Sequence, residues 1–379
     1  MRRLLLFPIT LIALVMLVPA VTNAQVVYGD PAQGSVRFVY QSWTVDDDIS
    51  GEEFDLSQWY FPVYAFIPIY DNTEIHFSTA TAGSSTDSAG SDISLAGMND
   101  TRLSVLHSLY EDRILLGMGL NLPTGKTKLD QEENIVGNLL TADFLSLPAK
   151  RYGEGFGLYM EAAYAERISN VSFGGGIGYQ LNASYSPVED IESYNPGNRF
   201  VIAVNGMLEH QYGTVYSYIR YNSFGVATQD DVDVYKMGAI TEFSVGSHIL
   251  YQSFKMHGGV RVLLRSPDEH LVDGSLVEFD ENNNGSEFRF FSDFGYELRN
   301  IGLASILLDY KLVSANGFDE SSEFFDGKAT LFGIGAAFER DLSERFTAEA
   351  QIKSYSGSAD DGNVDLSGLE IGLMLRVTL

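Results

Sequence analysis

Residues 97–126 read GMNDTRLSVLHSLYEDRILLGMGLNLPTGK, and this stretch decides the fold class. Two runs with strictly alternating apolar residues flank a turn at residues 111–112, which is the pattern of a β-hairpin. In the second run the positions between the apolar residues are Gly117, Gly119 and Asn121. Such small or polar residues would make a poor core for a water-soluble protein, so we expect the apolar side to face lipid and the small side to face a lumen.

The same alternation continues from Ser35 to the end of the chain. Segments of about ten residues with alternating hydrophobicity, separated by turn residues, are typical of transmembrane β-barrels. The predicted strands are residues 35–45, 57–69, 73–82, 100–110, 113–122, 154–166, 170–182, 198–210, 213–224, 235–245, 249–264, 286–298, 301–312, 328–340, 344–355 and 366–379. The predicted fold is therefore all-β, a transmembrane antiparallel up-and-down β-barrel of about 16 strands, with 14 as the alternative because the first strands are the least regular.

The connections between these strands alternate in length. The short turns are residues 70–72, 111–112, 167–169, 211–212, 246–248, Asn300 and 341–343. The long connections are residues 46–56, 83–99, 123–153, 183–197, 225–234, 265–285, 313–327 and 356–365. Bacterial outer-membrane barrels combine short periplasmic turns with long extracellular loops. Most acidic clusters fall in the long connections, so we expect the negative charge to lie outside the cell.

The N-terminus has the pattern of a secretory signal peptide. Two arginines precede an apolar run, and the small-residue stretch Thr22-Asn23-Ala24 follows it. The alternative is a membrane-anchor helix, but the apolar run is short for spanning about 30 Å of hydrocarbon. We expect a signal peptide at residues 1–24, a single barrel domain at residues 25–379 and a place in the outer membrane of a Gram-negative bacterium.

Composition narrows the partners. The chain has 51 acidic and 24 basic residues, a formal charge of −27, which argues against nucleic acid. Without cysteine there is neither a disulfide framework nor a thiolate metal site. The alternating last strand, residues 366–379, resembles the signal that the barrel-assembly machinery reads, although it ends in Leu379 rather than an aromatic residue. The expected partners are this machinery during biogenesis, outer-membrane lipid and lipopolysaccharide, and a small-molecule solute.

Charged residues on the predicted inner face are the candidates for lining a lumen. They are Glu161, Arg199, Arg220, Lys255, Arg261, Arg289, Glu339, Glu349, Glu370 and Arg376. Three of the acids lie on the last three strands, whereas two of the basic residues share a strand several places around the barrel. Opposite charge on opposite walls could orient a dipolar solute. The alternative is a set of ion pairs between adjacent strands that stiffen the barrel.

The longest connection is the only one with a helical pattern. It opens with Pro123, Thr124 and Gly125, and its apolar residues recur near helical spacing: Ile135, Val136, Leu139, Leu140 and Phe144. Two interpretations are open. The segment folds into the barrel mouth as a constriction or gate, or it forms a short helix that caps the rim at the lipid headgroups.

One connection resembles the start of a calcium-binding loop. Asp280, Asn282 and Asn284, followed by Gly285, have the opening spacing of an EF-hand. The twelfth position, where a bidentate Glu belongs, is Phe291. A structural calcium ion is therefore a hypothesis beside a plain polar loop, and no other cofactor is expected.

Catalysis finds little support in the sequence. The six histidines are scattered, and none has a metal-ligand spacing. A barrel phospholipase needs a His beside a Ser on the lipid-facing surface, and His107 near Ser104 or Ser108 is the nearest approximation. Ordinary strand residues explain these positions better, so we do not expect an enzyme.

The opening hairpin also carries a family resemblance. Gly97-Met98-Asn99-Asp100 before one strand and Leu122-Pro123-Thr124-Gly125 after the next resemble the "G-x-x-D … L-P-T-G" hairpin of the outer-membrane protein family linked to the meta-pathway of phenol degradation. That family is similar to the FadL-type channels. The resemblance implies a transporter without catalytic residues. The chain lacks the N-terminal hatch pattern of the fatty-acid channels, so a lateral export route is not implied.

Three functions follow as hypotheses. The first is an outer-membrane channel for passive uptake of small, hydrophobic or aromatic solutes. The second is a non-conducting surface barrel with an adhesion or envelope-structural role, acting through its acidic loops. The third is an exported soluble β-sandwich, whose strands would alternate in the same way.

Overall fold

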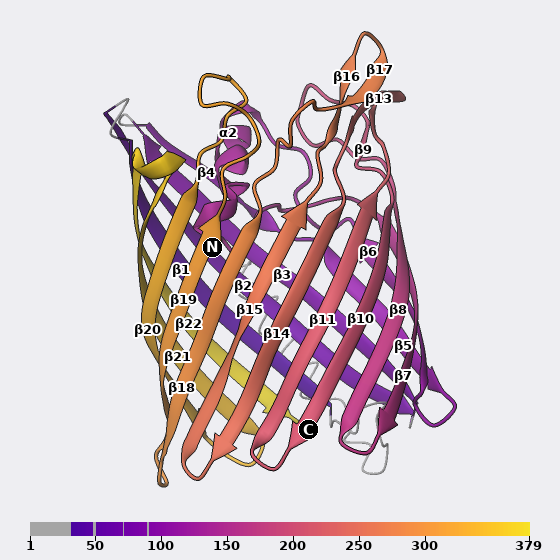
Figure 1. Ribbon diagram of the computed structural model, residues 1–379, viewed down its shortest axis with the longest axis vertical. Helices are drawn as coiled ribbons and strands as arrows, with labels where there is room; N and C mark the ends of the chain where they lie inside the picture. The colour runs from indigo at the N-terminus through magenta and orange to yellow at the C-terminus, as the bar shows by residue number, and fades with distance from the viewer. Residues whose placement is uncertain (1–31, 48–50, 71, 89–90) are drawn as a thin grey trace.

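The computed structural model describes residues 32–47, 51–70, 72–88 and 91–379. The predicted signal peptide, and Asp71 of the first predicted turn, lie outside the described residues. Tilted strands form a barrel (Figure 1). The strands of its wall are β1 (Gln33–Asp47), β2 (Glu52–Tyr70), β3 (Thr73–Ser88), β4 (Ser91–Met98), β5 (Thr101–Leu109), β6 (Ile114–Leu122), β7 (Gly157–Ile168), β8 (Val171–Asn182), β10 (Arg199–His210), β11 (Gly213–Phe224), β14 (Ile240–Tyr251), β15 (Phe254–Arg265), β18 (Glu287–Leu298), β19 (Gly302–Val313), β20 (Ala329–Asp341), β21 (Phe346–Ala359) and β22 (Val364–Thr378).

Every strand of the wall is antiparallel to its neighbours, and β1 pairs with β22 along its whole length to close the sheet. Both β4 and β5 pair with β3, and only Asn99 and Asp100 separate them. They therefore count as one wall strand, which makes a closed barrel of 16 strands. The predicted fold class and the higher of the two strand counts are confirmed.

The outer surface of the barrel is apolar, as the opening hairpin predicts. Leu116 and Met118 on β6 are 44% and 56% exposed, whereas Gly117 and Gly119, which alternate with them, are buried. A Cβ atom on Gly117 would lie 2.6 Å from the Cγ atom of Glu161 on β7. The small residues of the inner face therefore make room for charged neighbours, and the apolar residues face outward as lipid requires.

One predicted turn is wrong. Residues 246–248 lie inside β14, which continues to Tyr251, and the turn follows at Gln252. Gly246 suggested a turn, but its role is packing, because a Cβ there would lie 2.4 Å from the Tyr216 hydroxyl on β11. The strand predicted at residues 235–245 begins at Ile240 instead, because residues 232–236 form a separate strand, β13 (Val232–Lys236).

The first two predicted long connections are also wrong. Residues 46–56 and 83–99 belong largely to strands, since β1 and β2 pair as far as Asp47 and Glu52, and β3 and β4 pair as far as Ser88 and Ser91. Their Ser, Thr, Gly and Asp content suggested loops. The backbone groups of these residues are satisfied by each other across the hairpins, so the strands extend beyond the rest of the wall.

A second, smaller sheet stands above the long-loop end of the barrel (Figure 1). Its five strands occur in the order β17-β16-β13-β12-β9. They are β9 (Tyr194–Asn195), β12 (Ala227–Gln229), β13 (Val232–Lys236), β16 (Glu269–Val272) and β17 (Ser275–Glu278). Three of the predicted long connections thus fold together. Asp268 is buried beneath them, where it accepts hydrogen bonds from the Tyr235 hydroxyl, the Gly238 N–H and the Asn283 amide.

Aromatic residues mark the short-turn end of the barrel. Tyr212 and Tyr251 meet edge to face with ring centroids 5.6 Å apart, and Phe254 and Tyr296 with centroids 5.0 Å apart. All four side chains are exposed on the surface. Such rings are enriched where a barrel surface passes from hydrocarbon to headgroups. Among the described residues, no helix is long and apolar enough to cross a membrane.

Candidate functional site

The connection between β6 and β7 folds into a compact unit that we call the plug, residues 123–156. It contains the helix α2 (Gln131–Leu140) and the short 3-10 helix η1 (Asp143–Leu145). Helix α2 begins with a capping box, in which Asp130 accepts the Glu133 N–H and Glu133 accepts the Asp130 N–H. A helix of 10 residues is too short to be stable alone, so it depends on packing against the barrel.

The plug packs on the inner wall of the barrel and not on its rim. Val136 and Leu140 of α2 are fully buried. They join one hydrophobic cluster whose plug members are Val136, Leu140, Leu145, Leu147, Ala149 and Tyr152, and whose wall members are Trp43, Val45, Leu56, Ala82, Leu95, Ala329, Leu331, Tyr355, Ala359 and Leu366. Those wall strands, β1–β4 and β20–β22, form one continuous side of the barrel. Figure 1 shows α2 within the mouth beside β4. The segment therefore lies against the inner wall, whereas its role as a constriction or gate stays a prediction.

The predicted gating residues have different surroundings. Leu139 and Phe144 are partly buried against the cluster, whereas Ile135 is 50% exposed. The sequence pattern missed Leu147 and Tyr152, which follow the helical stretch. Burial raises the pKa of Tyr152 to about 12, and its hydroxyl lies 2.9 Å from the Ser84 hydroxyl of β3. An isolated tyrosine in a loop gives no periodic signal, so only the packing identifies it.

Both ends of the plug are tied to one carboxylate, an arrangement that we call the Asp100 clamp. Asp100, at the break between β4 and β5, accepts hydrogen bonds from the Gly125 N–H at 2.9 Å and from the Glu154 N–H at 2.6 Å. It also accepts one from the Asn121 amide at 2.9 Å. The hydroxyl of Thr124 accepts the Thr101 N–H at 2.9 Å. The motif residues therefore hold the entrance and the exit of the plug together.

Gly125 is required by the close approach inside this clamp. A Cβ atom on Gly125 would lie 2.3 Å from the main-chain oxygen of Tyr152 and 2.7 Å from a carboxylate oxygen of Asp100. Pro123 and Thr124 lie exposed beside it. The three residues predicted to open the gating loop thus lie at its anchor, away from the hydrophobic cluster.

Asp143 connects the plug to the far wall. Arg265 of β15 lies 2.5 Å from one of its carboxylate oxygens, and Lys150 of the plug pairs with the other. Lys311 of β19 donates to the main-chain oxygen of Asp143 and, at 3.2 Å, to the Ser146 hydroxyl. The plug therefore bridges the barrel from β3 and β4 to β15 and β19.

The electrostatics of Asp143 give this bridge a defined pH dependence. Burial raises the pKa of the Asp143 carboxyl, but hydrogen bonds and charge from Lys150 and Arg265 outweigh burial, so its pKa lies below the ordinary value of 3.8. A group with a lowered pKa stabilises the folded state above its unfolded pKa, and the stabilisation is lost as the pH falls through the folded value. The bridge is therefore intact at neutral pH.

We expect the plug to loosen only in acid, at pH values below about 4. Asp143→Asn removes the charge and should give the loosened state at pH 7. Limited proteolysis of the plug and the current noise of single channels measure the loosening across this pH range. Asp341→Asn, on a short turn at the other end, is the matched control. A plug in Asp143→Asn as resistant as that of the wild type at pH 7 would contradict the role of the bridge.

The strand register places all ten predicted lumen residues on the inner face of the barrel. Several make contacts between neighbouring strands. Arg220 pairs with Glu242 at 3.6 Å, and Arg261 pairs with Glu242 at 3.8 Å and with Glu287 at 2.6 Å. Arg289 pairs with Asp309. These pairs match the ion-pair alternative, whose acceptors Glu287 and Asp309 the sequence pattern did not single out.

The other lumen candidates have different neighbours. Glu370 accepts hydrogen bonds from the Gln41 and Gln351 amides, both at 2.6 Å, and from the Tyr355 hydroxyl at 3.1 Å. Glu161 accepts the Tyr159 hydroxyl. The remaining candidates, Arg199, Lys255, Glu339, Glu349 and Arg376, lie on the inner face without joining a single site. The ten predicted lumen residues therefore form a polar inner surface and not one binding site.

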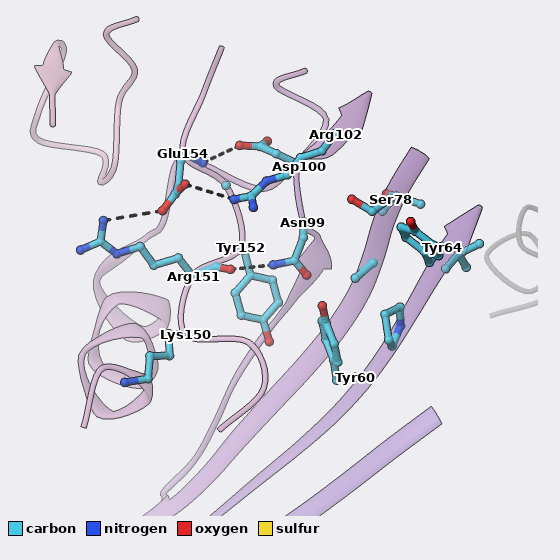
Figure 2. A pocket seen from close by; sticks show the side chains of 15 residues that line it. Tyr60, Tyr64, Ser78, Asn99, Asp100, Arg102, Lys150, Arg151, Tyr152 and Glu154 are labelled. Atoms are coloured by element: carbon cyan, nitrogen blue, oxygen red, sulfur yellow. Dashed lines mark hydrogen bonds and ion pairs between the residues drawn. The ribbon is translucent and has the colours of Figure 1, made fainter. Parts of the chain in front are cut away.

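A cavity of about 480 Å³ lies between the plug and the wall, and we call it the tyrosine pocket. It is lined by β2, β3 and β5 on one side and by residues 150–154 on the other, as Figure 2 shows. Its aromatic residues are Tyr60, Tyr64 and Tyr152, and Arg102 and Arg151 supply positive charge. None of these five residues stood out in the sequence, because they come from three separate segments: β2, β5 and residues 150–154.

A hydrogen-bonded relay supports one wall of this pocket. The Tyr64 hydroxyl lies 2.6 Å from Nδ1 of His76, and Nε2 of His76 lies 2.7 Å from Oε1 of Glu74. The Glu74 side chain is fully buried. His76 and Glu74 are two residues apart on one strand, so alternation places both on the inner face.

The candidate calcium loop is held by hydrogen bonds of its own. The Asn282 amide donates to the main-chain oxygen of Arg265 at 3.0 Å, and the Asn284 amide donates to that of Ser266 at 3.1 Å. The side-chain oxygen of Asn282 accepts the Asn284 N–H at 3.1 Å. Within the described part of the chain, no group of three or more His, Cys, Asp or Glu residues could hold a metal ion. Calcium binding with Asp280 would need both amides to turn.

The His107 neighbourhood does not form a hydrolase site. His107 lies on the outer face and its Nδ1 atom is 2.8 Å from the Thr73 hydroxyl. Ser104 and Ser108 lie on the opposite face of β5, since alternation separates odd from even positions. Ser108 donates to Asp112 in the short turn instead.

A closed antiparallel barrel with an apolar outer surface and an internal plug defines a transmembrane β-barrel protein with a partly filled lumen. No protein-family model matches this sequence, and no curated protein matches it. Solved structures of outer-membrane proteins are similar to it in outline. A FadL homologue of Pseudomonas aeruginosa is 8% identical, with 93% of this chain and 91% of that chain covered and a TM-score of 0.45.

Two further structures show the same degree of similarity. OccK7 (OpdD) of Pseudomonas aeruginosa is 11% identical over 92% of this chain and 100% of its own, with a TM-score of 0.46. The CymD monoaromatic hydrocarbon channel is 11% identical over 96% of this chain and 92% of its own, with a TM-score of 0.40. Identities of 8–11% and TM-scores of 0.40–0.46 are too low to transfer a function, so the function of this chain is inferred from its own contacts.

Proposed function

We propose that this protein is an outer-membrane channel through which small solutes, aromatic or otherwise hydrophobic ones among them, diffuse passively past the plug. The observation that carries the proposal is the plug itself, which is fixed to opposite walls of the lumen and leaves a cavity against one of them. A barrel that served only as a structural element would not need a lining of charged and aromatic side chains around such a cavity.

The distribution of polarity supports the same proposal. Charged residues line the inner face, and apolar residues cover the outer face, as in barrels that lie in lipid and hold water. The outer-membrane location and export through a signal peptide at residues 1–24 belong to this proposal. Membership of the family linked to the meta-pathway of phenol degradation is also part of this proposal. In that case, Asp100 and Gly125 of the shared hairpin motif are the residues that anchor the plug.

The alternative is a non-conducting surface barrel. The observation in its favour is the five-stranded sheet above the barrel, which exposes Val232, Leu271 and Val277. Such a sheet could bind an extracellular partner and leave the lumen closed. The two proposals differ in whether solutes cross the barrel.

Conductance in planar bilayers and swelling of liposomes with a panel of solutes test the proposal. We expect discrete current steps, and swelling that is faster for small solutes than for large ones. Heat-modifiable migration on a gel shows that the protein is folded. Folded protein that gives neither current steps nor swelling would favour the surface barrel.

A further inference from the structure

We propose that the tyrosine pocket binds small aromatic carboxylates that carry a hydroxyl group, with Arg102 holding the carboxylate and Tyr64 accepting the hydroxyl. The inference rests on the proposed channel function and names its solute class. It assigns Arg102 and Tyr64 as specificity-determining residues, and Glu74 and His76 as positioning residues that act through Tyr64.

The strand register sets the spacing of the two polar ends. Tyr64 pairs with Ser78, and Ser78 pairs with Arg102, so the three residues lie side by side on β2, β3 and β5. Neighbouring strands are about 4.8 Å apart, which puts the backbones of Tyr64 and Arg102 roughly 10 Å apart. The residue between them is a small serine, which leaves room above it. A single benzene ring with polar groups at opposite ends spans such a gap.

The positive end of the pocket is only loosely neutralised. Arg102 lies 3.8 Å from Glu154, and Arg151 lies 4.0 Å from the same carboxylate (Figure 2). The Arg102 side chain is 69% exposed. Asp100, the other acid of the pocket, already accepts three N–H groups in the clamp. Two guanidinium groups therefore share one carboxylate, and a second carboxylate from a solute fits the fork of Arg102.

The other end of the pocket presents an acceptor. Nε2 of His76 faces a carboxylate oxygen of Glu74, which is an acceptor, so the tautomer that satisfies both contacts carries its hydrogen on Nε2 and accepts at Nδ1. The donor that reaches Nδ1 among the described residues is the Tyr64 hydroxyl, 2.6 Å away. Because the hydrogen of Tyr64 is committed to His76, its free lone pairs can only receive a hydrogen bond. This end of the pocket therefore selects a solute with a donor.

The space between the two ends suits an aromatic ring. Tyr60 and Tyr152 line the pocket, and Pro62 adds an apolar surface beside Tyr64. Ring contacts of this kind favour flat solutes over chain-like ones of equal volume. A volume of about 480 Å³ lies in the range of small-molecule sites.

Equilibrium binding to the folded full-length barrel in detergent tests the inference, with 4-hydroxybenzoate, benzoate and phenol as probes. We expect 4-hydroxybenzoate to bind roughly tenfold more tightly than either single-group probe. Relative to benzoate it adds the contact of the hydroxyl with Tyr64, and relative to phenol it adds the contact of the carboxylate with Arg102. Arg102→Gln should abolish its advantage over phenol, and Tyr64→Phe should abolish its advantage over benzoate. His76→Phe keeps Tyr64 but removes the group that orients its hydroxyl, so it should reduce the advantage of 4-hydroxybenzoate over benzoate.

Two control variants keep the result specific. Arg113→Gln removes an arginine that pairs with Glu166 at a short turn, and Tyr221→Phe removes a hydroxyl from the outer face. Neither should change the order of the three probes. Equal binding of the three probes, or an order that Arg102→Gln leaves intact, would overturn the inference. Conducting channels without this preference would leave the channel function standing, whereas binding with this preference but without conductance would remove the channel and keep the pocket.

Discussion

Replacing residues 132–145 by a short Gly-Ser linker is expected to raise the single-channel conductance severalfold. The replacement removes nearly all of α2 and the whole of η1, so the hydrophobic cluster loses Val136, Leu140 and Leu145. It also removes Asp143, which ties the plug to Arg265 of the far wall. The barrel itself is closed by the pairing of β1 with β22, which this change does not touch, so the wall should remain folded around a wider lumen.

A replacement of equal length elsewhere controls for the loss of chain. Residues 314–327 connect β19 and β20 at the same end of the barrel as the plug. Their aromatic residues Phe318 and Phe324 contact Phe279 of another long connection. The same linker there should leave the conductance near the wild-type value. If the plug replacement folds, by its heat-modifiable migration, and conducts like the wild type, residues 132–145 do not restrict passage.

Asp100→Ala is expected to release both ends of the plug at once. The substitution leaves the N–H groups of Gly125 and Glu154 without their acceptor. Hydrogen bonds to a charged group contribute about 1.5 to 3 kcal/mol each, and several are lost, so the plug should lose roughly 2 to 4 kcal/mol of its stability after water replaces part of them. Hydrogen exchange of plug amides should speed up, and channels should show frequent current fluctuations.

Asp55 on β2 gives the matched control for Asp100. Its carboxylate accepts the Thr44 hydroxyl on an exposed part of the wall. Asp55→Ala should leave plug exchange and current noise unchanged. Plug amides in Asp100→Ala that exchange as slowly as in Asp55→Ala would show that the hydrophobic cluster alone holds the plug.

Gly125→Ala tests the same clamp without removing a hydrogen-bonding group. The new Cβ would meet main-chain atoms of Tyr152 and Asp100, which cannot move without separating the plug ends. Gly117→Ala is the matched control, because the atoms it would meet belong to the flexible side chains of Glu161 and Leu106. We expect faster plug exchange in the first variant and a near-normal plug in the second, and equal behaviour of the two would contradict the close approach at Gly125.

The sequence by itself determined the barrel. Whether a residue faces lipid or lumen depends on its place in a period of two, and that period is local and visible in runs such as Leu116, Met118 and Leu120. The strand count followed from the same period. The predicted strand bounds were wrong where a glycine had a packing role instead of a turn role, as at Gly246, and where small polar residues continue a strand, as after Ala82 in β3.

Only the tertiary structure decided where the plug lies and what it leaves open. The apolar spacing of α2 fits an inner wall and a rim equally well, because spacing tells which side is buried and not against what. The clamp joins Asp100, Gly125 and Glu154, and the pocket joins Tyr64, Ser78 and Arg102, across strands whose register no local pattern sets. Contacts of that kind exist only once a closed barrel fixes each strand against the next, so the site depends on the register of the whole wall.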